Sequence, residues 1–209
     1  MRTSAHLVGD EESSKRRQIL NGACKVFLEL GFDGASMGDI ARAADVSKGT
    51  LYFYFADKCR LFEAIVEEVT LERRQLAFYF DPAIDIKTTL RRFGEAYIGM
   101  LCRPRGGSAA RMVFAIAERM PEIGRRYYER VVQKTVNLLA EYLDERVKQR
   151  ELVIDDCQLA AMQFMAMCQA SLFLPFIYQV APAPSQERIT WVVDDAVRTF
   201  LAANAVKTI

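Results

Sequence analysis

Apolar residues recur every three to four positions along most of the chain, and no segment alternates apolar and polar residues as a β-strand does. Glycine and proline interrupt this pattern at several places, for example at Gly31, at Gly34 and in the run 103–107, and these interruptions mark helix ends. The pattern predicts an all-α fold with about nine helices. The predicted helices span residues 13–30, 36–43, 47–53, 57–80, 84–102, 108–119, 121–149, 155–178 and 186–204.

Two of the predicted helices, at 36–43 and 47–53, are short and close together. Ser36 and Asp39 form a capping box at the start of the first, and Ser47 is a suitable N-cap for the second. Helices this short are not stable alone, so they must pack against the preceding helix. This layout predicts a helix-turn-helix. The side chains expected to make the apolar contacts are Ile19, Ala23, Val26, Phe27, Leu30, Ile40, Ala44, Val46 and Leu51.

The second short helix has two chemically different faces. Leu51 and Phe55 are four residues apart and are expected to point inward. The opposite face combines a cation, a hydroxyl and two phenols, and Gly49 allows a close backbone approach. Such a face suits DNA, although ordinary solvated side chains would give the same pattern. The outward residues are Lys48, Thr50, Tyr52 and Tyr54.

Overall charge does not indicate a partner. The 209 residues include 28 Lys and Arg and 27 Asp and Glu, so any nucleic-acid contact must depend on locally placed cations. Five cysteines form no C-x-x-C pair and no metal-ligand spacing, and the first residues lack the apolar stretch of a signal peptide. We therefore predict free thiols, no metal site and a cytoplasmic location.

The stretch 157–186 contains no charged residue and is long enough to cross a bilayer. However, it contains several glutamines and Pro175, and no cluster of Lys or Arg flanks it. A helix that is apolar on all sides is equally suited to burial within protein. We therefore predict burial and no membrane insertion.

The residue patterns of known catalytic sites are missing from the sequence. The only histidine, His6, lies before the first predicted helix, and there is no Ser/His/Asp set, Cys/His pair, H-E-x-x-H motif or glycine-rich phosphate loop. The sequence therefore predicts no catalytic residues, no cofactor and no enzymatic activity.

Residues 14–63 contain one long motif with regular spacing. It reads Ala23-x3-Phe27-x3-Gly31-Phe32-x3-Ser36-Met37-x2-Ile40-Ala41-x2-Ala44-x-Val46-Ser47-Lys48-Gly49-Thr50-Leu51-Tyr52-x-Tyr54-Phe55-x2-Lys58-x2-Leu61-Phe62. This motif resembles the N-terminal domain of the tetracycline-repressor (TetR) family of transcriptional regulators. Asp45 stands where the family often has glycine, and Tyr54 where it often has histidine. Asp tolerates left-handed backbone better than most residues, and Tyr still offers a hydroxyl to a phosphate.

The resemblance implies binding to double-stranded operator DNA. Ser36, Tyr54 and Lys58 would contact phosphates, which set the register of the protein on DNA but do not identify bases. Met37, next to Ser36, belongs to the same implied contact set. The implied major-groove face consists of Lys48, Gly49, Thr50 and Tyr52.

Residues 81–209 carry no comparable motif. In the TetR family this part binds a small ligand and forms a homodimer through its last two helices. The uncharged stretch 157–178 and the apolar spacing along 186–204 agree with that arrangement. Aromatic and sulfur-containing side chains are candidate effector contacts, although each could equally be a core residue. These candidates are Phe93, Tyr97, Met100, Met112, Phe114, Met162, Met165, Phe173 and Phe176.

The resemblance thus implies a ligand-responsive regulator, in the first instance a repressor that a small lipophilic or aromatic effector releases from its operator. Two alternatives stay open: an activator of the same family, and a helical lipid- or partner-binding protein. The implied divisions are a flexible tail at 1–12, a DNA-binding domain at 13–56, a connecting helix at 57–80, and a ligand-sensing and dimerisation domain at 81–209.

Overall fold

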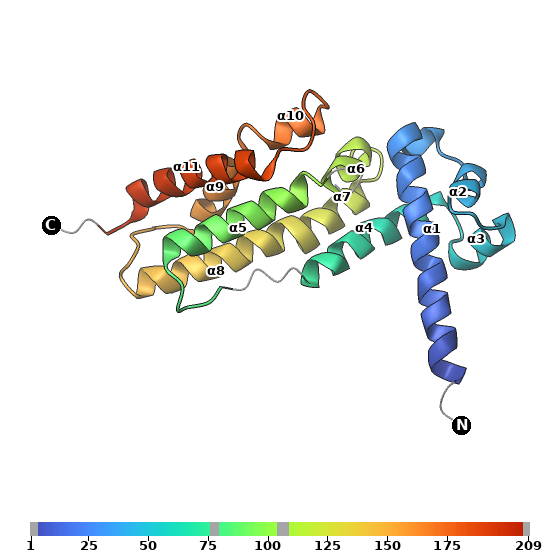
Figure 1. Ribbon diagram of the computed structural model, residues 1–209, viewed down its shortest axis with the longest axis horizontal. Helices are drawn as coiled ribbons and strands as arrows, with labels where there is room; N and C mark the ends of the chain where they lie inside the picture. Colours follow the sequence, from blue (N-terminus) through green and yellow to red (C-terminus); the bar gives the residue numbers. More distant parts are fainter. Residues whose placement is uncertain (1–3, 76–79, 104–108, 207–209) are drawn as a thin grey trace. The chain divides into compact units, whose positions relative to one another are not determined.

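The computed structural model describes the backbone of residues 4–75, 80–103 and 109–206, and these residues form helices without a β-strand (Figure 1). An isolated antiparallel bridge pairs Leu152 with Ala205. The predicted all-α fold class is therefore confirmed. The helices are α1 (Ser4–Gly34), α2 (Met37–Ala43), α3 (Lys48–Tyr54), α4 (Lys58–Gln75), α5 (Ile86–Leu101), α6 (Ala109–Ile116), α7 (Pro121–Tyr127), the π-helical segment η1 (Tyr128–Gln133), α8 (Lys134–Lys148), α9 (Cys157–Gln169), α10 (Phe173–Ile177) and α11 (Gln186–Asn204).

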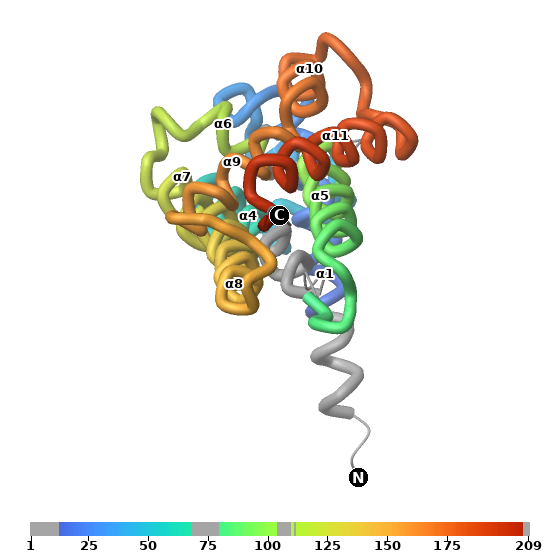
Figure 2. The backbone as a smooth tube through the Cα atoms, turned by 90° about the vertical axis from the view of Figure 1, so that its left-hand side faces the viewer, coloured from blue at the N-terminus to red at the C-terminus, as the bar shows by residue number. Residues whose placement is uncertain are grey.

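The chain folds into two compact units. The first unit comprises residues 1–73 and 109–124, and the second comprises residues 74–108 and 125–209. The first unit therefore contains α1, α2, α3 and α6, and the second contains α5 and α8 to α11. Figure 2 shows α5, α9 and α11 packed side by side in the second unit.

Aromatic side chains from α1 and α4 form the centre of the first unit. Phe27 packs edge-on against Phe62, with ring centroids 5.2 Å apart. The chain turns at Gly31, whose φ is 70°, and this turn brings Phe32 into a stacked contact with Phe27. Leu30, which we expected in this core, is exposed, because Phe32 fills the place beside Phe27 and Phe62. Seven of the nine predicted core residues are buried, namely Ile19, Ala23, Val26, Phe27, Ile40, Ala44 and Leu51, and Val46 is half-buried.

Glycine allows α1 to cross the end of α2 at close range. A Cβ atom on Gly22 would lie 2.6 Å from the Cα and Cβ atoms of Ala44. One turn earlier in α1, the side-chain amide of Gln18 donates to the carbonyl oxygens of Ala44 and Asp45, at 2.7 and 3.4 Å. These contacts fix α1 to the turn between α2 and α3.

The second unit has an apolar core with polar contacts along one seam. Gly94 of α5 lies against α9 and α11, since a Cβ there would be 2.7 Å from Val193 Cγ1 and 3.1 Å from Cys168 Sγ. Towards the surface, Arg91 forms an ion pair with Asp194, and Thr190 donates to Glu95 Oε1 at 2.6 Å. The seam therefore fixes the register of α5 against α11.

Several helices differ from their predicted bounds. The predicted helix 121–149 consists of α7, the π-helical segment η1 and α8, and the predicted helix 108–119 ends at Ile116. The predicted helix 155–178 is broken into α9 and α10, because Pro175 has no N–H and its ring clashes with the carbonyl group four residues earlier. The helix α1 already includes residues 4–12, which we expected to form a flexible tail. The helix α4 is described as far as Gln75; residues 76–79 of the predicted helix 57–80 lie outside the described residues, and Phe80 is not helical.

Membrane insertion finds no support in the described segments. Within residues 4–75, 80–103 and 109–206, none of the helices has the length and hydropathy that a membrane span requires.

Candidate DNA-binding surface and effector region

The helix α2 begins at the predicted capping box. Ser36 accepts the backbone N–H of Asp39 at 3.1 Å, and its hydroxyl donates to Asp39 Oδ2 at 2.5 Å. Arg42 donates to the other carboxylate oxygen of Asp39 at 3.1 Å. The hydrogen bond from Ser36, assisted by the charge of Arg42, holds the pKa of Asp39 below its usual value. The start of α2 is therefore fixed, with Ser36 exposed and Met37 half-buried at its tip.

The helix α3 begins at Ser47, as predicted. The Ser47 Oγ accepts the backbone N–H of Thr50 at 3.0 Å, and the two hydroxyl groups lie 2.8 Å apart. Leu51 is fully buried and Phe55 nearly so, which confirms the predicted inward face. The turn before α3 passes through Asp45 with φ 51°, a left-handed conformation that Asp accepts better than most residues.

The opposite face of α3 is open to solvent. Lys48, Gly49 and Tyr52 are exposed, and Thr50 and Tyr54 are half-buried. The Lys48 side chain runs alongside α2, because a Cβ on Gly38 would lie 3.3 Å from Lys48 Cε. The structure therefore presents a cation, a hydroxyl and two phenols from one short, capped helix.

Phe53 is a surface residue of α3 that sequence reasoning missed. Its side chain is 79% exposed, and its ring meets the Tyr54 ring edge-to-face at a centroid distance of 5.3 Å. Its position in the helical repeat could have identified it, since Phe53 lies between the inward positions 51 and 55 and cannot share their face.

Lys58, at the start of α4, holds the end of α1 in place. Its Nζ donates to the carbonyl oxygen of Ala35 at 2.9 Å and to that of Asp33 at 3.4 Å. The ammonium group also lies 4.6 Å from the centroid of the Phe32 ring. Lys58 thus joins α4 to the segment that leads into Ser36.

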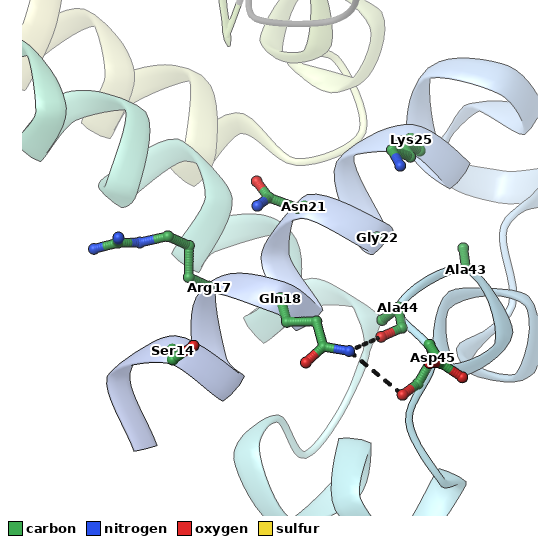
Figure 3. A pocket seen from close by; sticks show the side chains of 9 residues that line it. All are labelled: Ser14, Arg17, Gln18, Asn21, Gly22, Lys25, Ala43, Ala44 and Asp45. Carbon is green, nitrogen blue, oxygen red and sulfur yellow. Dashed lines mark hydrogen bonds between the residues drawn. The ribbon is translucent and has the colours of Figure 1, made fainter. Parts of the chain in front are cut away.

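An open groove runs between α1 and the turn that precedes α3 (Figure 3). Its volume is about 430 Å³, and Figure 3 shows the Gln18 amide reaching across it to the carbonyl groups of Ala44 and Asp45. The lining residues are Ser14, Arg17, Gln18, Asn21, Gly22, Lys25, Ala43, Ala44 and Asp45. The groove belongs to the helix-turn-helix itself and is not among the predicted sites.

The predicted effector contacts fall into three groups. In the second unit, six of them are buried: Phe93, Tyr97, Met100, Met165, Phe173 and Phe176. Met162 of α9 belongs to the same unit but is exposed. Met112 and Phe114 lie on α6 in the first unit, where Met112 is buried beside Cys24 and Phe114 is exposed.

Four aromatic residues of the second unit form a stacked row, in which Phe80 is half-buried and the other three are buried. Phe80, Phe93 and Tyr97 stack in sequence with centroid distances of 6.0 Å, and Phe80 also stacks on Tyr142 at 4.7 Å. Gln169 of α9 donates a hydrogen bond to the hydroxyl of Tyr97.

The described side chains contain no group of three or more His, Cys, Asp or Glu residues placed to hold a metal. The five cysteines are free thiols. Burial raises the pKa of the Cys168 thiol to about 12 and that of Cys102 to about 11. These two thiols therefore stay protonated at neutral pH.

Two family models match the chain and together cover most of it. Residues 19–65 match bacterial regulatory proteins of the tetR family, and residues 88–206 match the C-terminal domain of AefR-like transcriptional repressors. The chain belongs to the tetR family of bacterial regulatory proteins. Regulators of this family bind operator DNA and act as dimers, and they are not enzymes.

Known proteins resemble this tetR-family chain over different shares of its length. A TetR-family structure from Mesorhizobium loti MAFF303099 is 26% identical with a TM-score of 0.79, covering 93% of this chain and 98% of its own. The Flavonoid-responsive Regulator FrrA is 28% identical with a TM-score of 0.73, covering 94% and 100%. The repressor Rv1474c of Mycobacterium tuberculosis is 39% identical over 61 residues, 29% of this chain and 33% of its own length. The chain thus spans about a third of that curated repressor.

Proposed function

We propose that this tetR-family chain is a repressor that binds double-stranded operator DNA as a homodimer and is released by a small apolar or aromatic effector. The observation that carries the proposal is the outward face of α3. There, Lys48, Thr50 and Tyr52 project from a helix whose start is capped by Ser47 and whose other face is anchored by Leu51. A helix held in this way loses little conformational freedom when it enters the major groove.

The side chains of α3 supply both kinds of contact that sequence-specific binding needs. Lys48 can donate to guanine O6 and N7, and the Thr50 methyl group suits a thymine methyl. Gly49 lets the backbone approach closely, and Tyr52 extends the same face.

Phosphate contacts would come from both sides of α3. Tyr54 offers a hydroxyl group. The single O–H of Ser36 donates to Asp39 Oδ2, so it would have to turn from that carboxylate to reach a phosphate. Met37 lies beside Ser36 at the start of α2. Lys58 uses its ammonium group on two backbone carbonyls, and an ammonium has three N–H donors, so one remains for a phosphate. These contacts would orient α3 without selecting bases.

The dimer would form through the last two long helices, α9 and α11. These helices pack against each other, and they expose the apolar side chains of Leu159, Met162 and Trp191. Met162 is therefore better suited to the dimer interface than to the effector pocket. A two-fold interface uses the same patch on both copies, so these side chains would cover one another.

The effector would bind in the second unit, near the aromatic row. The buried candidates Phe93, Tyr97, Met100, Met165, Phe173 and Phe176 supply apolar and aromatic surface. The flavonoid response in the name of FrrA, a relative of 28% identity, supports a planar aromatic effector. Five free thiols agree with a cytoplasmic location.

Fluorescence anisotropy would test the proposal directly. The purified chain is titrated into labelled DNA from its own upstream region and into a scrambled duplex, across a salt series. We expect tight, selective binding whose logarithm falls linearly with the logarithm of the salt concentration. Equal affinity for both duplexes calls for selection from genomic fragments, and failure to enrich any fragment would refute operator binding.

A further inference from the structure

The segment that joins α9 to α11 displays apolar side chains to solvent. Leu174 is 55% exposed, Tyr178 74% and Val180 81%. No charged residue lies between positions 157 and 186. Large apolar side chains gathered on one short segment are a common sign of an interaction surface.

This segment is anchored on one side and open on the other. Phe173 and Phe176 of α10 are buried in the second unit. Leu174 and Tyr178 are four residues apart, so they share the opposite face of the helix. The short helix therefore holds its outer face in a defined position.

Hydrogen bonds also fix the backbone of the residues that follow α10. The backbone N–H groups of Val180 and Ala181 both donate to the carbonyl oxygen of Pro175, at 2.9 and 3.1 Å. Gln179 takes a left-handed conformation, with φ 58°, to close that turn. The apolar side chains are thus displayed on a preorganised backbone, which lowers the entropic cost of binding.

The exposed segment is continuous with the proposed dimer interface. The Arg188 guanidinium of α11 lies 4.4 Å from the centroid of the Trp191 ring, which is 63% exposed. The Nη2 of Arg188 donates to Ser171 Oγ at 3.4 Å, and Ser171 lies in the turn before α10. Arg188 therefore links the exposed face of α11 to the base of the segment.

We propose that residues 174–180 form an arm that packs on the partner protomer and extends the α9–α11 interface. The occupant is a second copy of this chain. This inference rests on the proposed dimer. An uncharged apolar surface is poorly suited to DNA phosphates, and it lacks the cluster of cations that favours anionic lipid. In a two-fold dimer each arm would contact the other copy, so every side chain contributes twice.

Photo-crosslinking tests where the arm lies. Tyr178, Trp191 and Tyr128 are each replaced with p-benzoylphenylalanine in separate full-length proteins, and sedimentation establishes that each is a dimer before irradiation. Trp191 reports the α9–α11 interface, and Tyr128 is an exposed tyrosine of η1 outside the arm. We expect covalent dimers from positions 178 and 191 and none from position 128.

The crosslinking outcomes separate the arm from the proposed dimer. Covalent dimers from position 191 alone would overturn the arm and leave the α9–α11 interface intact. Dimers from neither position, in a protein that sediments as a dimer, would overturn both placements. Crosslinks from position 178 only to lipid or to another protein would also overturn the assignment of a second copy.

Sedimentation of a second pair of variants measures the contribution of the arm. The double substitution Leu174→Ser/Tyr178→Ser should weaken dimerisation at least about tenfold, because each copy loses two apolar contacts. The matched control is Leu138→Ser/Tyr128→Ser, which changes the same residue types at other exposed positions. Circular dichroism verifies that both proteins are folded. Equal dimer dissociation constants for the two variants would contradict the proposal.

Discussion

Tyr54 and Lys48 lie on the same short helix but are expected to contribute differently to DNA binding. Tyr54→Phe removes one hydroxyl donor to a phosphate, so affinity should fall by about fivefold for every DNA sequence. Lys48→Ala should weaken binding and also relax the preference for one base pair. Anisotropy against a library of single-base operator variants distinguishes the two patterns.

Tyr128→Phe, a change of the same type in the second unit, is the control for Tyr54→Phe. A loss confined to one base pair in Tyr54→Phe would argue against a phosphate contact. An unchanged preference profile in Lys48→Ala would remove Lys48 from the reading face.

The thiols differ in the environment that surrounds each sulfur atom. Cys59 is exposed, whereas Cys168 is buried and its pKa is raised to about 12 by desolvation. Because the thiolate is the nucleophile, brief treatment with iodoacetamide at neutral pH should label Cys59 and leave Cys168 unmodified. Peptide mass spectrometry gives the extent at each site, and labelling of the denatured chain provides the reference. Equal labelling of both thiols in the native protein would mean that the second unit opens on the time scale of labelling.

Single residues show where sequence reasoning succeeded and where it failed. The pairing of Leu51 with Phe55 followed from helical spacing alone, because both lie inside one helix. Leu30 failed because the turn at Gly31 brings Phe32 back over the core, and helical spacing carries no information beyond the last turn. The exposure of Phe53 was not predicted, although its position in the helical repeat excluded it from the inward face of α3.

At the scale of helices, Ser47 sets the start of α3. Ser47→Ala removes the acceptor for the Thr50 N–H and should cost about 1 kcal/mol of unfolding free energy. Operator affinity should fall as well, since α3 would begin less regularly. Ser47→Asn keeps a capping acceptor, so it should retain most of the unfolding free energy and most of the operator affinity. Urea denaturation measures the first quantity and anisotropy the second. A loss of equal size in Ser47→Asn would show that the cap is not the cause.

The crossing of α1 over α2 depends on the missing side chain of Gly22. Gly22→Ala places a methyl group 2.6 Å from backbone atoms of Ala44, so α1 must shift, at a cost of about 1–3 kcal/mol. Gly99→Ala on α5 is the matched control, because apart from its own stretch of helix no described atom lies within 4 Å of the point that a Cβ atom would occupy there. It should stabilise the protein by about 0.5–1 kcal/mol through helix propensity. Thermal unfolding of both variants tests the pair, and the same sign of change in both would contradict the close approach.

Helix boundaries were predictable where capping residues mark them. Ser36 and Ser47 identified the starts of α2 and α3 because their side chains bond to the backbone a few residues away. The break between α9 and α10 was missed, although Pro175 was visible, because the apolar pattern continues through it. The start of α1 at Ser4 was missed because residues 4–12 carry no apolar period.

At the scale of the whole molecule, the sequence predicts the two parts of the chain unequally. Residues 14–63 carry a recognisable motif, whereas residues 81–209 do not. The helix-turn-helix could be read because its residues interact over short chain distances. The aromatic row could not, since Phe80, Phe93 and Tyr142 come from three separate segments. Likewise, the arm at 174–180 becomes visible only once the exposed side of α10 is known.

The proposed release mechanism requires two states that effector and operator favour differently. If the effector binds better to the state that binds DNA poorly, each ligand must weaken the other by the same factor. With a planar flavonoid as the probe, we expect operator affinity to fall by about 5- to 150-fold, the range of typical coupling energies. Calorimetry of the flavonoid with the free protein and with the operator complex gives the reciprocal factor, and a scrambled duplex is the control. If the two ligands weaken each other by unequal factors in a closed two-site titration, this two-state scheme is ruled out. If the flavonoid binds without any change in operator affinity, flavonoid-driven release is excluded and the proposal of DNA binding is unaffected.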